Sequence, residues 1–247
     1  MNFKFVLHLL FMALPFFYTE EITTGSGQLV LNEENSKHIV QVLRMQMGNQ
    51  LKLTDGKGNI FTAVIIDDHK KKCTVTIQSK QFQQQTANKV TIAISLIKNA
   101  SRFEWFLEKA TEIGVSEIIP LLCERTEKQH FRFDRMKGIL ISAMLQSQQC
   151  WLPVLHEPVK FINVISDQNE RKKLIAHCED EVSKVSITNQ LLKDTTHKLI
   201  LIGPEGDFTN DEIKMAVQHN FLPVALGNTR LRTETAGVVA ATLLCNT

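Results

Sequence analysis

Two apolar runs near the end of the chain each stop at a glycine. The first, Leu199–Ile202, has four consecutive apolar residues and is followed by Gly203-Pro204-Glu205-Gly206; the second, Pro223–Leu226, stops at Gly227. Unbroken apolar runs are typical of strands buried on both faces, as in a parallel sheet, and glycine lets the chain turn with little side-chain bulk. The segment therefore predicts two parallel strands of an α/β fold that end at the same edge of a sheet.

Helical patterns follow both turns. Thr209 with Glu212 three residues later forms a capping box that starts one helix, and the apolar segment from Gly237 to Leu244 predicts a last helix. Strands that end in glycine leave bare backbone at the carboxyl edge of an open α/β sheet, where such sheets usually bind ligands. A small-molecule site is thus one interpretation, and ordinary turns within a core are the other.

Composition sets wide limits on the class of protein. The chain has 247 residues, 43% of them hydrophobic and 22% charged, as in an ordinary globular protein of one large or two modest domains. A net charge of +2 is too small to indicate a nucleic-acid binder by itself and does not exclude one. The five cysteines are scattered, without C-x-x-C pairs, which favours a reducing compartment and no structural metal.

The first residues have an apolar character of their own. Lys4 precedes the apolar stretch Phe5–Leu14, which has the outline of a signal peptide but is too short to span a membrane and lacks a clear cleavage site. Three interpretations of residues 1–15 stay open: an export signal, a strand or helix of the protein, or translated upstream sequence with Met12 as the true start.

Residues 16–82 predict a small β-barrel domain. The segment Glu34–Met45 has apolar residues at helical spacing, which predicts one helix crossing the barrel. His38 and Arg44 on this helix are candidates for contact with RNA, and the alternative is a solvated helix face. The predicted strands are rich in β-branched residues and are Gln28–Leu31, Gln50–Thr54, Ile60–Ile66 and Cys73–Ile77.

After a polar linker at residues 83–89, strands and helices alternate through residues 90–247, which predicts a parallel sheet. Ser101 and Glu104 form a second capping box, which predicts a helix ending at Gly114. Pro120 within an apolar run predicts an edge or a strand end. The further predicted elements are the strands Val90–Leu96, Ile118–Leu122 and Leu174–Cys178 and a helix at Phe133–Gln149.

The two glycine turns, followed by Leu231-Arg232-Thr233-Glu234-Thr235-Ala236, resemble the RsmE family, the 16S ribosomal RNA uridine-N3 methyltransferases of the SPOUT class. The resemblance extends over nearly the whole chain from Phe16. It implies a SPOUT-type open parallel sheet with a trefoil knot that binds S-adenosylmethionine, preceded by a PUA-like RNA-binding domain. It also implies a cytoplasmic homodimer that acts on 16S rRNA or the small ribosomal subunit, without metal or membrane, and it favours Met12 as the start.

The resemblance also implies roles for individual residues. Arg232 and Glu234, with Glu205 as a competing carboxylate, are the catalytic candidates: the guanidinium would stabilise charge on the uracil oxygens and a carboxylate would accept the N3 proton. Alternatively, Arg232 and Glu234 pair with each other and hold the loop. Candidate cofactor contacts are Leu201, Gly203, Pro204, Glu205, Gly206, Leu226, Gly227, Leu231, Thr233 and Ala236, and candidate RNA contacts are His38, Arg44, Lys98, Arg102 and Arg125.

The sequence departs from the family pattern at two places. Asp207 stands where a second glycine is usual, and Gln148-Gln149-Cys150 lacks a basic residue. These departures motivate a second function class, a catalytically impaired RNA-binding or ribosome-binding protein that keeps the fold; the apolar start motivates a third, an exported or membrane-tethered protein. His177 and Cys178, after a buried strand, are interpreted as core residues rather than nucleophiles.

Overall fold

The computed structural model describes residues 14–20, 22, 27–127, 130–166, 171–179, 183–187 and 197–246. The alternatives for the apolar start and for Met12 thus fall outside the described residues, apart from residues 14 and 15. The chain divides into two compact units, one made of Met1–Gln85 with Gln148–Trp151 and the other of Thr86–Ser147 with Leu152–Thr247. Each unit has its own hydrophobic core.

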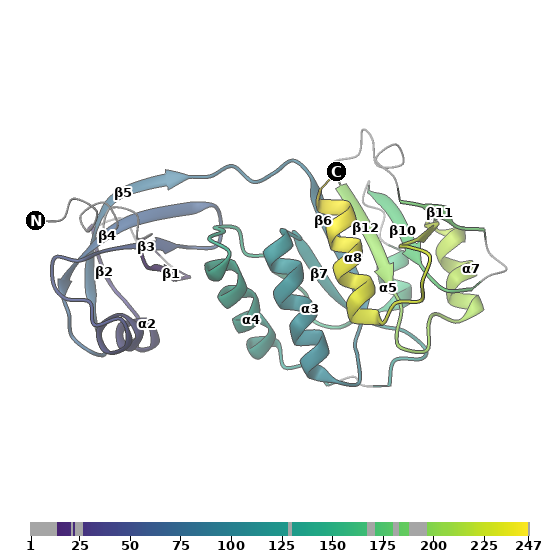
Figure 1. Ribbon diagram of the computed structural model, residues 1–247, viewed down its shortest axis with the longest axis horizontal. Coiled ribbons are helices and arrows are strands. Elements are labelled where there is room, and N and C mark those ends of the chain that lie inside the picture. The colour runs from purple at the N-terminus through teal and green to yellow at the C-terminus, as the bar shows by residue number, and fades with distance from the viewer. Residues whose placement is uncertain are drawn as a thin grey trace, which may run out of the picture. The chain divides into compact units, whose positions relative to one another are not determined.

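The first unit is a curled five-stranded sheet in the order β1-β3-β4-β5-β2, in which only the β1–β3 pair is parallel (Figure 1). Every second residue of β3 and β4 is buried, which is the pattern of strands with one face on a core. The strands are β1 (Phe16–Tyr18), β2 (Gln28–Val30), β3 (Gln50–Thr54), β4 (Asn59–Asp67) and β5 (Thr74–Phe82).

The predicted helix Glu34–Met45 corresponds to one continuous helical stretch, made of α2 (Glu33–Lys37) and the π-helix η1 (His38–Val42). The Asn32 side chain accepts from the amide of Asn35 and starts α2. The turn then widens, because the amide of Leu43 donates to the carbonyl of His38, and Arg44 ends the helical stretch at a φ of 55°. The predicted helix is therefore present, although its second half is a π-helix and it ends at Val42 rather than Met45.

Residues 148–151, which follow the last turn of a helix of the second unit, belong to the first unit. The amide of Gly58 donates to the carbonyl of Cys150, and the Trp151 indole N–H donates to the carbonyl of Gln83 at 2.8 Å. Gly58 has a φ of 87°, and a β-carbon at this position would overlap the Trp151 ring. The turn containing Gly58 thus forms a seat for Trp151 that only glycine permits.

The second unit is an all-parallel sheet in the order β11-β13-β10-β12-β6-β7-β8, with β9 also paired to β7 (Figure 1). The predicted fold class, an open parallel sheet after a small β domain, is confirmed, while the threading of the knot stays a prediction. The strands are β6 (Lys89–Ser95), β7 (Glu117–Leu122), β8 (Val154–Leu155), β9 (Val159–Lys160), β10 (Lys172–Ala176), β11 (Val185–Ser186), β12 (His197–Ile202) and β13 (Leu222–Ala225).

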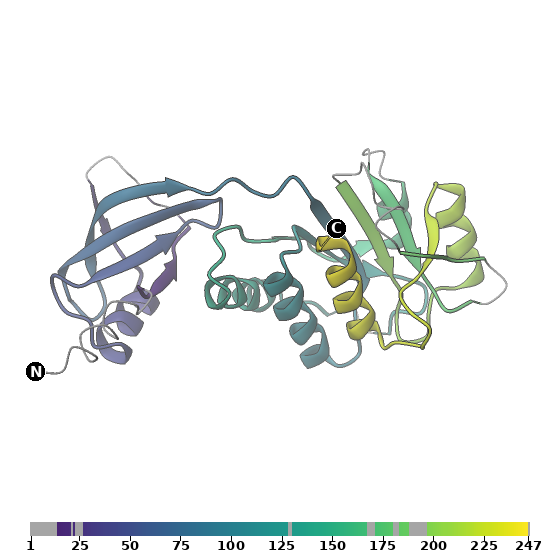
Figure 2. The ribbon, with the colours of Figure 1, turned by 45° about the horizontal axis from the view of Figure 1, so that its top comes forward.

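Helices cover both faces of this sheet (Figure 2). Residues alternate along the central strand β12, so that Ile200 and Ile202 pack toward α3, α4 and α8 while Leu199 and Leu201 pack toward α5 and α7. This alternation explains why the run is apolar without a break. The helices are α3 (Ala100–Ile113), α4 (Phe133–Gln146), α5 (Phe161–Ile165), α7 (Asn210–Gln218) and α8 (Thr233–Cys245).

Three predicted details of the second unit can be compared with the structure. The Thr209–Glu212 capping box is present at the start of α7. The one predicted at Ser101 is wrong, because the Asn99 side chain caps α3 and Glu104 instead forms a two-pronged ion pair with Arg135. The edge or strand end predicted at Pro120 is wrong, because Pro120 lies inside β7, which pairs with β6 on one side and with β8 and β9 on the other; the proline lies where the pairing passes from β8 to β9.

Helix α8 starts at Thr233, one turn earlier than the predicted Gly237, with Arg232 as its N-cap residue. Glu234 therefore lies in the first turn of a helix, where the helix dipole favours a negative charge. Within the described residues, no helix is long and apolar enough to cross a membrane, and no cluster of potential metal ligands is found.

Candidate active site

A cavity of about 780 Å³ opens at the carboxyl edge of the parallel sheet. Its walls come from the segments that follow β10, β12 and β13, which are neighbours in the sheet, and from the start of α8. This is the ligand edge expected of an open α/β sheet. The size is within the range of small-molecule sites, roughly 300–1,000 Å³.

Most of the candidate cofactor contacts line this cavity. Leu201 and Gly206 do not: the Leu201 side chain is fully buried in the core on the α5–α7 face of the sheet, and Gly206 faces Arg125. The candidates in the cavity wall are Gly203, Pro204, Glu205, Leu226, Gly227, Leu231, Thr233 and Ala236. The two glycine turns thus lie on opposite sides of one space.

The first glycine turn is held in shape by hydrogen bonds from both sides. The amide of Asp207 donates to the carbonyl of Pro204 at 2.9 Å, which closes the turn. The guanidinium of Arg125 donates to the carbonyl of Gly206 at 2.7 Å. Arg125, a candidate for RNA contact, therefore supports the wall of the cavity.

Asp207 has a φ of 64°, a conformation that Asp adopts more readily than most residues. One carboxylate oxygen accepts from the amide of Cys178 at 2.7 Å and the other from the amide of Phe208 at 2.8 Å. The residue that departs from the family pattern thus joins the glycine turn after β12 to the end of β10.

The catalytic candidates are arranged around Arg102, which also lines the cavity. Arg102 lies 3.6 Å from a carboxylate oxygen of Glu205 and 3.7 Å from one of Glu234. The predicted alternative of an Arg232–Glu234 pair is not found among the described residues. Arg102, a candidate for RNA contact, thus lies within ion-pair distance of two carboxylates, and its contact with RNA stays a prediction.

Arg232 and Glu234 differ in exposure. Arg232 is exposed, lines the cavity and forms no ion pair within the described part of the chain. Glu234 is only 6% exposed, and its second carboxylate oxygen is buried without a hydrogen-bond partner among the described residues. An available guanidinium and an incompletely satisfied carboxylate are therefore close in sequence at the start of α8.

His177 is a cavity residue that the sequence interpretation assigned to the core. It follows β10, is 7% exposed, and neither ring nitrogen has a hydrogen-bond partner among the described residues. Burial lowers the pKa of the imidazole, Lys184 lowers it further, and Asp207 and Glu179 partly oppose this. A signal for it exists in the sequence, since it directly follows a buried strand at the same edge as the two glycines.

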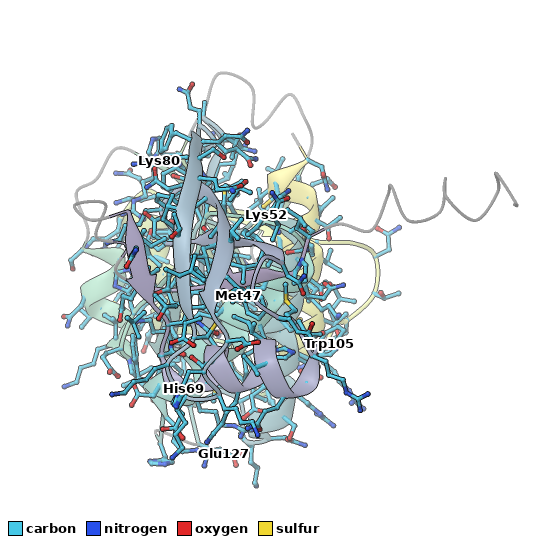
Figure 3. The ribbon with its side chains drawn as sticks, turned by 90° about the vertical axis from the view of Figure 1, so that its left-hand side faces the viewer. Met47, Lys52, His69, Lys80, Trp105 and Glu127 are labelled. Atoms are coloured by element: carbon cyan, nitrogen blue, oxygen red, sulfur yellow. The ribbon has the colours of Figure 1, made fainter. Side chains whose placement is uncertain are left out.

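The other candidates for RNA contact are not among the residues that line the cavity. Lys98 forms an exposed ion pair with Glu127 at 3.0 Å. In the first unit, His38 is exposed with its ring against Phe17, and Arg44 is exposed. Near Arg44, the side chain of Met47 is 70% exposed and is labelled at the surface in Figure 3.

Comparison with known proteins identifies the family. Residues 84–245 match the RNA methyltransferase domain family, and residues 31–78 match the RNA methyltransferase PUA domain. The chain belongs to the RNA methyltransferase family. Its second unit carries the methyltransferase domain, and the match to the PUA domain lies within its first unit.

Relatives in this family match the chain over most of its length. The ribosomal RNA small subunit methyltransferase E of Buchnera aphidicola subsp. Acyrthosiphon pisum is 30% identical over 240 residues, covering 94% of this chain and 92% of that protein. The crystal structure of a probable rRNA-methyltransferase from Porphyromonas gingivalis is 39% identical, with a TM-score of 0.84, and covers 94% of this chain and 98% of that one.

A third relative was solved with a ligand. The ribosomal RNA small subunit methyltransferase E from Neisseria gonorrhoeae, bound to S-adenosyl methionine, is 26% identical with a TM-score of 0.82, covering 93% of this chain and 95% of that one. The chain is therefore an enzyme of the RNA methyltransferase family, similar in both sequence and fold to rRNA-modifying relatives.

Proposed function

We propose that this chain methylates the N3 position of a specific uridine in 16S ribosomal RNA, with S-adenosylmethionine as the methyl donor. The observation that carries the proposal is the cavity between the two glycine turns, with Arg232 available at its rim. The donor fits this site chemically, because bare backbone at Gly203 and Gly227 lets a nucleoside approach closely and buried His177 offers unused hydrogen-bonding atoms. When bound, S-adenosylmethionine supplies an electrophilic methyl group on a sulfonium.

The protein's own residues prepare the acceptor. Uracil N3 carries a proton that must leave before or as the nitrogen reacts, and negative charge then spreads onto the two neighbouring oxygens. The Arg232 guanidinium stabilises that charge, and a carboxylate accepts the proton. Glu205 is the more accessible carboxylate and lines the cavity, whereas Glu234 is buried with one free oxygen.

Arg102 lies within ion-pair distance of both carboxylates. Its guanidinium lies between Glu205 and Glu234 and keeps them oriented toward the same side chain. Orientation is the main requirement of an in-line methyl transfer, since donor and acceptor must be aligned. Arg102 is thus a positioning residue, and RNA recognition is left to Arg232 and to the first unit, where His38 and Arg44 are exposed.

The first experiment measures cofactor binding and product together. Calorimetric titration of the purified chain with S-adenosylmethionine should show saturable binding, and small subunits lacking the modification should gain 3-methyluridine, identified by nucleoside mass spectrometry. Arg232→Ala should keep binding and lose product. Methylation at another ring position would contradict the proposal, and binding without any product would favour the catalytically impaired alternative.

An occluding variant completes this experiment. A β-carbon on Gly227 meets no atom within 4 Å, whereas one on Gly203 would lie 3.0 Å from the Phe208 ring. Gly227→Val therefore adds bulk at the cavity at a position where the β-carbon has space. Gly203→Val is less suitable, because the Phe208 ring would have to shift. Loss of S-adenosylmethionine binding in Gly227→Val, with an unchanged unfolding temperature, is the expected result; unchanged binding would place the cofactor elsewhere.

The remaining expectations stay predictions. The chain is expected to act as a cytoplasmic homodimer on rRNA or on the small ribosomal subunit. Analytical ultracentrifugation of the purified chain tests the dimer, and comparison of naked 16S rRNA with assembled small subunits in the product assay distinguishes the two substrates.

A further inference from the structure

His177 lines the cavity directly after β10, the strand between β12 and β13. It follows Ala176, which pairs with Ile202 of β12 on one side and with Val224 of β13 on the other. The glycine turns after β12 and β13 therefore flank the position of His177 in the sheet. A ligand that reaches both turns therefore lies close to this position in the sheet.

The side chain of His177 is unsatisfied. It is more than nine-tenths buried, it lines the cavity, and neither ring nitrogen has a partner among the described residues. A buried polar atom without a hydrogen bond is unfavourable and is rare in native proteins. The arrangement is consistent with a group that is completed by a ligand.

The ring faces a mixed set of charges. Lys184, Asp207 and Glu179 all influence it, with the lysine opposing the two carboxylates. Burial is the largest influence and favours the neutral ring. A neutral imidazole has one N–H donor and one acceptor nitrogen.

Among the groups of the methyl donor, each ribose hydroxyl can both donate and accept, so it can pair with either nitrogen of a neutral imidazole. The ribose also lies between the base and the amino-acid part of that ligand. We propose that His177 hydrogen-bonds a ribose hydroxyl of the bound methyl donor. The inference rests on the proposed use of S-adenosylmethionine and adds to it the residue that reads the sugar.

The test is a coupling measurement with S-adenosylhomocysteine and its 2′-deoxy and 3′-deoxy forms as probes. Calorimetry compares the wild-type chain with His177→Phe, which keeps a planar ring without hydrogen-bonding atoms, and with His177→Gln, which can still donate and accept. For the wild-type chain, one deoxy probe should bind about three- to tenfold more weakly than the ribose form.

His177→Phe should bind the ribose probe more weakly by a similar factor. Removal of the same hydroxyl from the probe should then cause no further loss of affinity in this variant, since the effects of interacting partners are not additive. His177→Gln should recover part of the affinity and covers the case in which the phenylalanine variant does not fold. Equal losses from the hydroxyl in all three proteins would overturn this inference and leave the proposed function standing. Failure of the wild-type chain to bind any probe would overturn both.

Discussion

Two polar groups at the amino edge of the parallel sheet differ from two at its carboxyl edge in whether their atoms have hydrogen-bond partners. At the amino edge, Glu117 at the start of β7 accepts hydrogen bonds from Thr91 and Arg171, at 2.5 and 3.0 Å, and lies 2.7 Å from His156. At the carboxyl edge, His177 and one oxygen of Glu234 are buried without partners among the described residues.

A second group at the amino edge follows the same rule as Glu117. Lys198 near the start of β12 is only 2% exposed, and its ammonium donates to the Asn88 side chain at 2.6 Å and to the carbonyl of Leu244. Burial lowers the pKa of Lys198. Charged groups at this edge are thus enclosed together with their partners.

The difference separates stability from function on one scaffold. Polar groups that form hydrogen bonds with each other hold the ends of strands together. Removing one of them leaves the others buried without a hydrogen-bond partner, which is unfavourable. Polar groups that lack partners destabilise the empty protein and gain partners from a ligand. Substitutions at the amino edge should therefore change stability alone, and substitutions at the carboxyl edge should change binding or turnover.

The largest effect is expected at the carboxyl edge. Arg232→Ala should lower the rate of RNA methylation about 10²- to 10³-fold, as when a single group that stabilises developing charge is removed. The unfolding temperature and the affinity for S-adenosylmethionine should not change, because Arg232 is exposed and forms no ion pair in the described part of the chain. Single-turnover kinetics and calorimetry on the same preparation measure both, and a parallel loss of stability would break the comparison.

The next effect belongs to the amino edge. Glu117→Gln should lower the free energy of unfolding by about 2 kcal/mol, since hydrogen bonds to a charged group are lost, without changing cofactor affinity. Urea denaturation measures the difference at neutral pH. Altered cofactor binding in this variant would show that the two edges are coupled.

The same residue predicts a pH dependence. Burial works against the charged form of Glu117, but hydrogen bonds from Thr91 and His156 and the charge of Arg171 outweigh it, so the pKa is lowered below 4.5. The stability from this group is complete above the pKa of the unfolded chain and is lost as pH falls through the lower folded value. The difference in the free energy of unfolding between wild type and Glu117→Gln should therefore disappear as the pH falls below about 4.

A smaller effect of opposite sign is expected at His177. Because the His177 ring is buried without hydrogen-bond partners among the described residues, His177→Phe should raise the unfolding free energy of the ligand-free protein by about 1 kcal/mol. The same variant should bind S-adenosylmethionine more weakly. The pKa of His177 is lowered in the folded state, so the wild-type protein loses stability as pH falls below about 6.5, the pKa of an unfolded histidine. The advantage of the variant should thus grow between pH 7 and 5, and a variant less stable than wild type would assign His177 to the core.

The smallest effect is expected at Asp207. Asp207→Gly relieves a left-handed backbone, worth about 1 kcal/mol, and loses two hydrogen bonds of about 1 kcal/mol each, so the free energy of unfolding should fall by only about 1 kcal/mol. Cofactor affinity should stay within about threefold of wild type. A large gain in affinity would mean that the aspartate hinders the site, as the impaired alternative requires.

The sequence predicted the strands better than the surroundings of the site. Residues 50–54 form a strand with the predicted bounds, because alternation and β-branching are local properties of the chain. The ion pairs of Arg102, a candidate for RNA contact, could not be predicted, since its meeting with Glu205 and Glu234 depends on the packing of α3 beside α8. The same holds for Arg125, whose hydrogen bond to Gly206 spans 81 residues.

Two other residues could have been placed from the sequence. Leu201 precedes Ile202 in a strand that is covered on both faces. Because neighbouring side chains in a strand point to opposite faces, the two must pack against different helices. His177 directly follows a strand whose neighbours end at Gly203 and near Gly227, and only the strand order, which the sequence does not give, was missing. Unpartnered nitrogens could not be predicted, since satisfaction depends on the whole fold.

The packing of Trp151 against the turn at Gly58 limits how segments of this chain can be exchanged with those of a relative. Its first unit is not a continuous stretch of sequence, because residues 148–151 belong to it. A recombination that exchanges only the first 85 residues would leave the turn at Gly58 without its tryptophan, so functional chimeras need to carry the four later residues as well. The chain also has two tryptophans, Trp151 in the first unit and Trp105 in the second, so replacing either one by phenylalanine gives a protein whose fluorescence reports on a single unit.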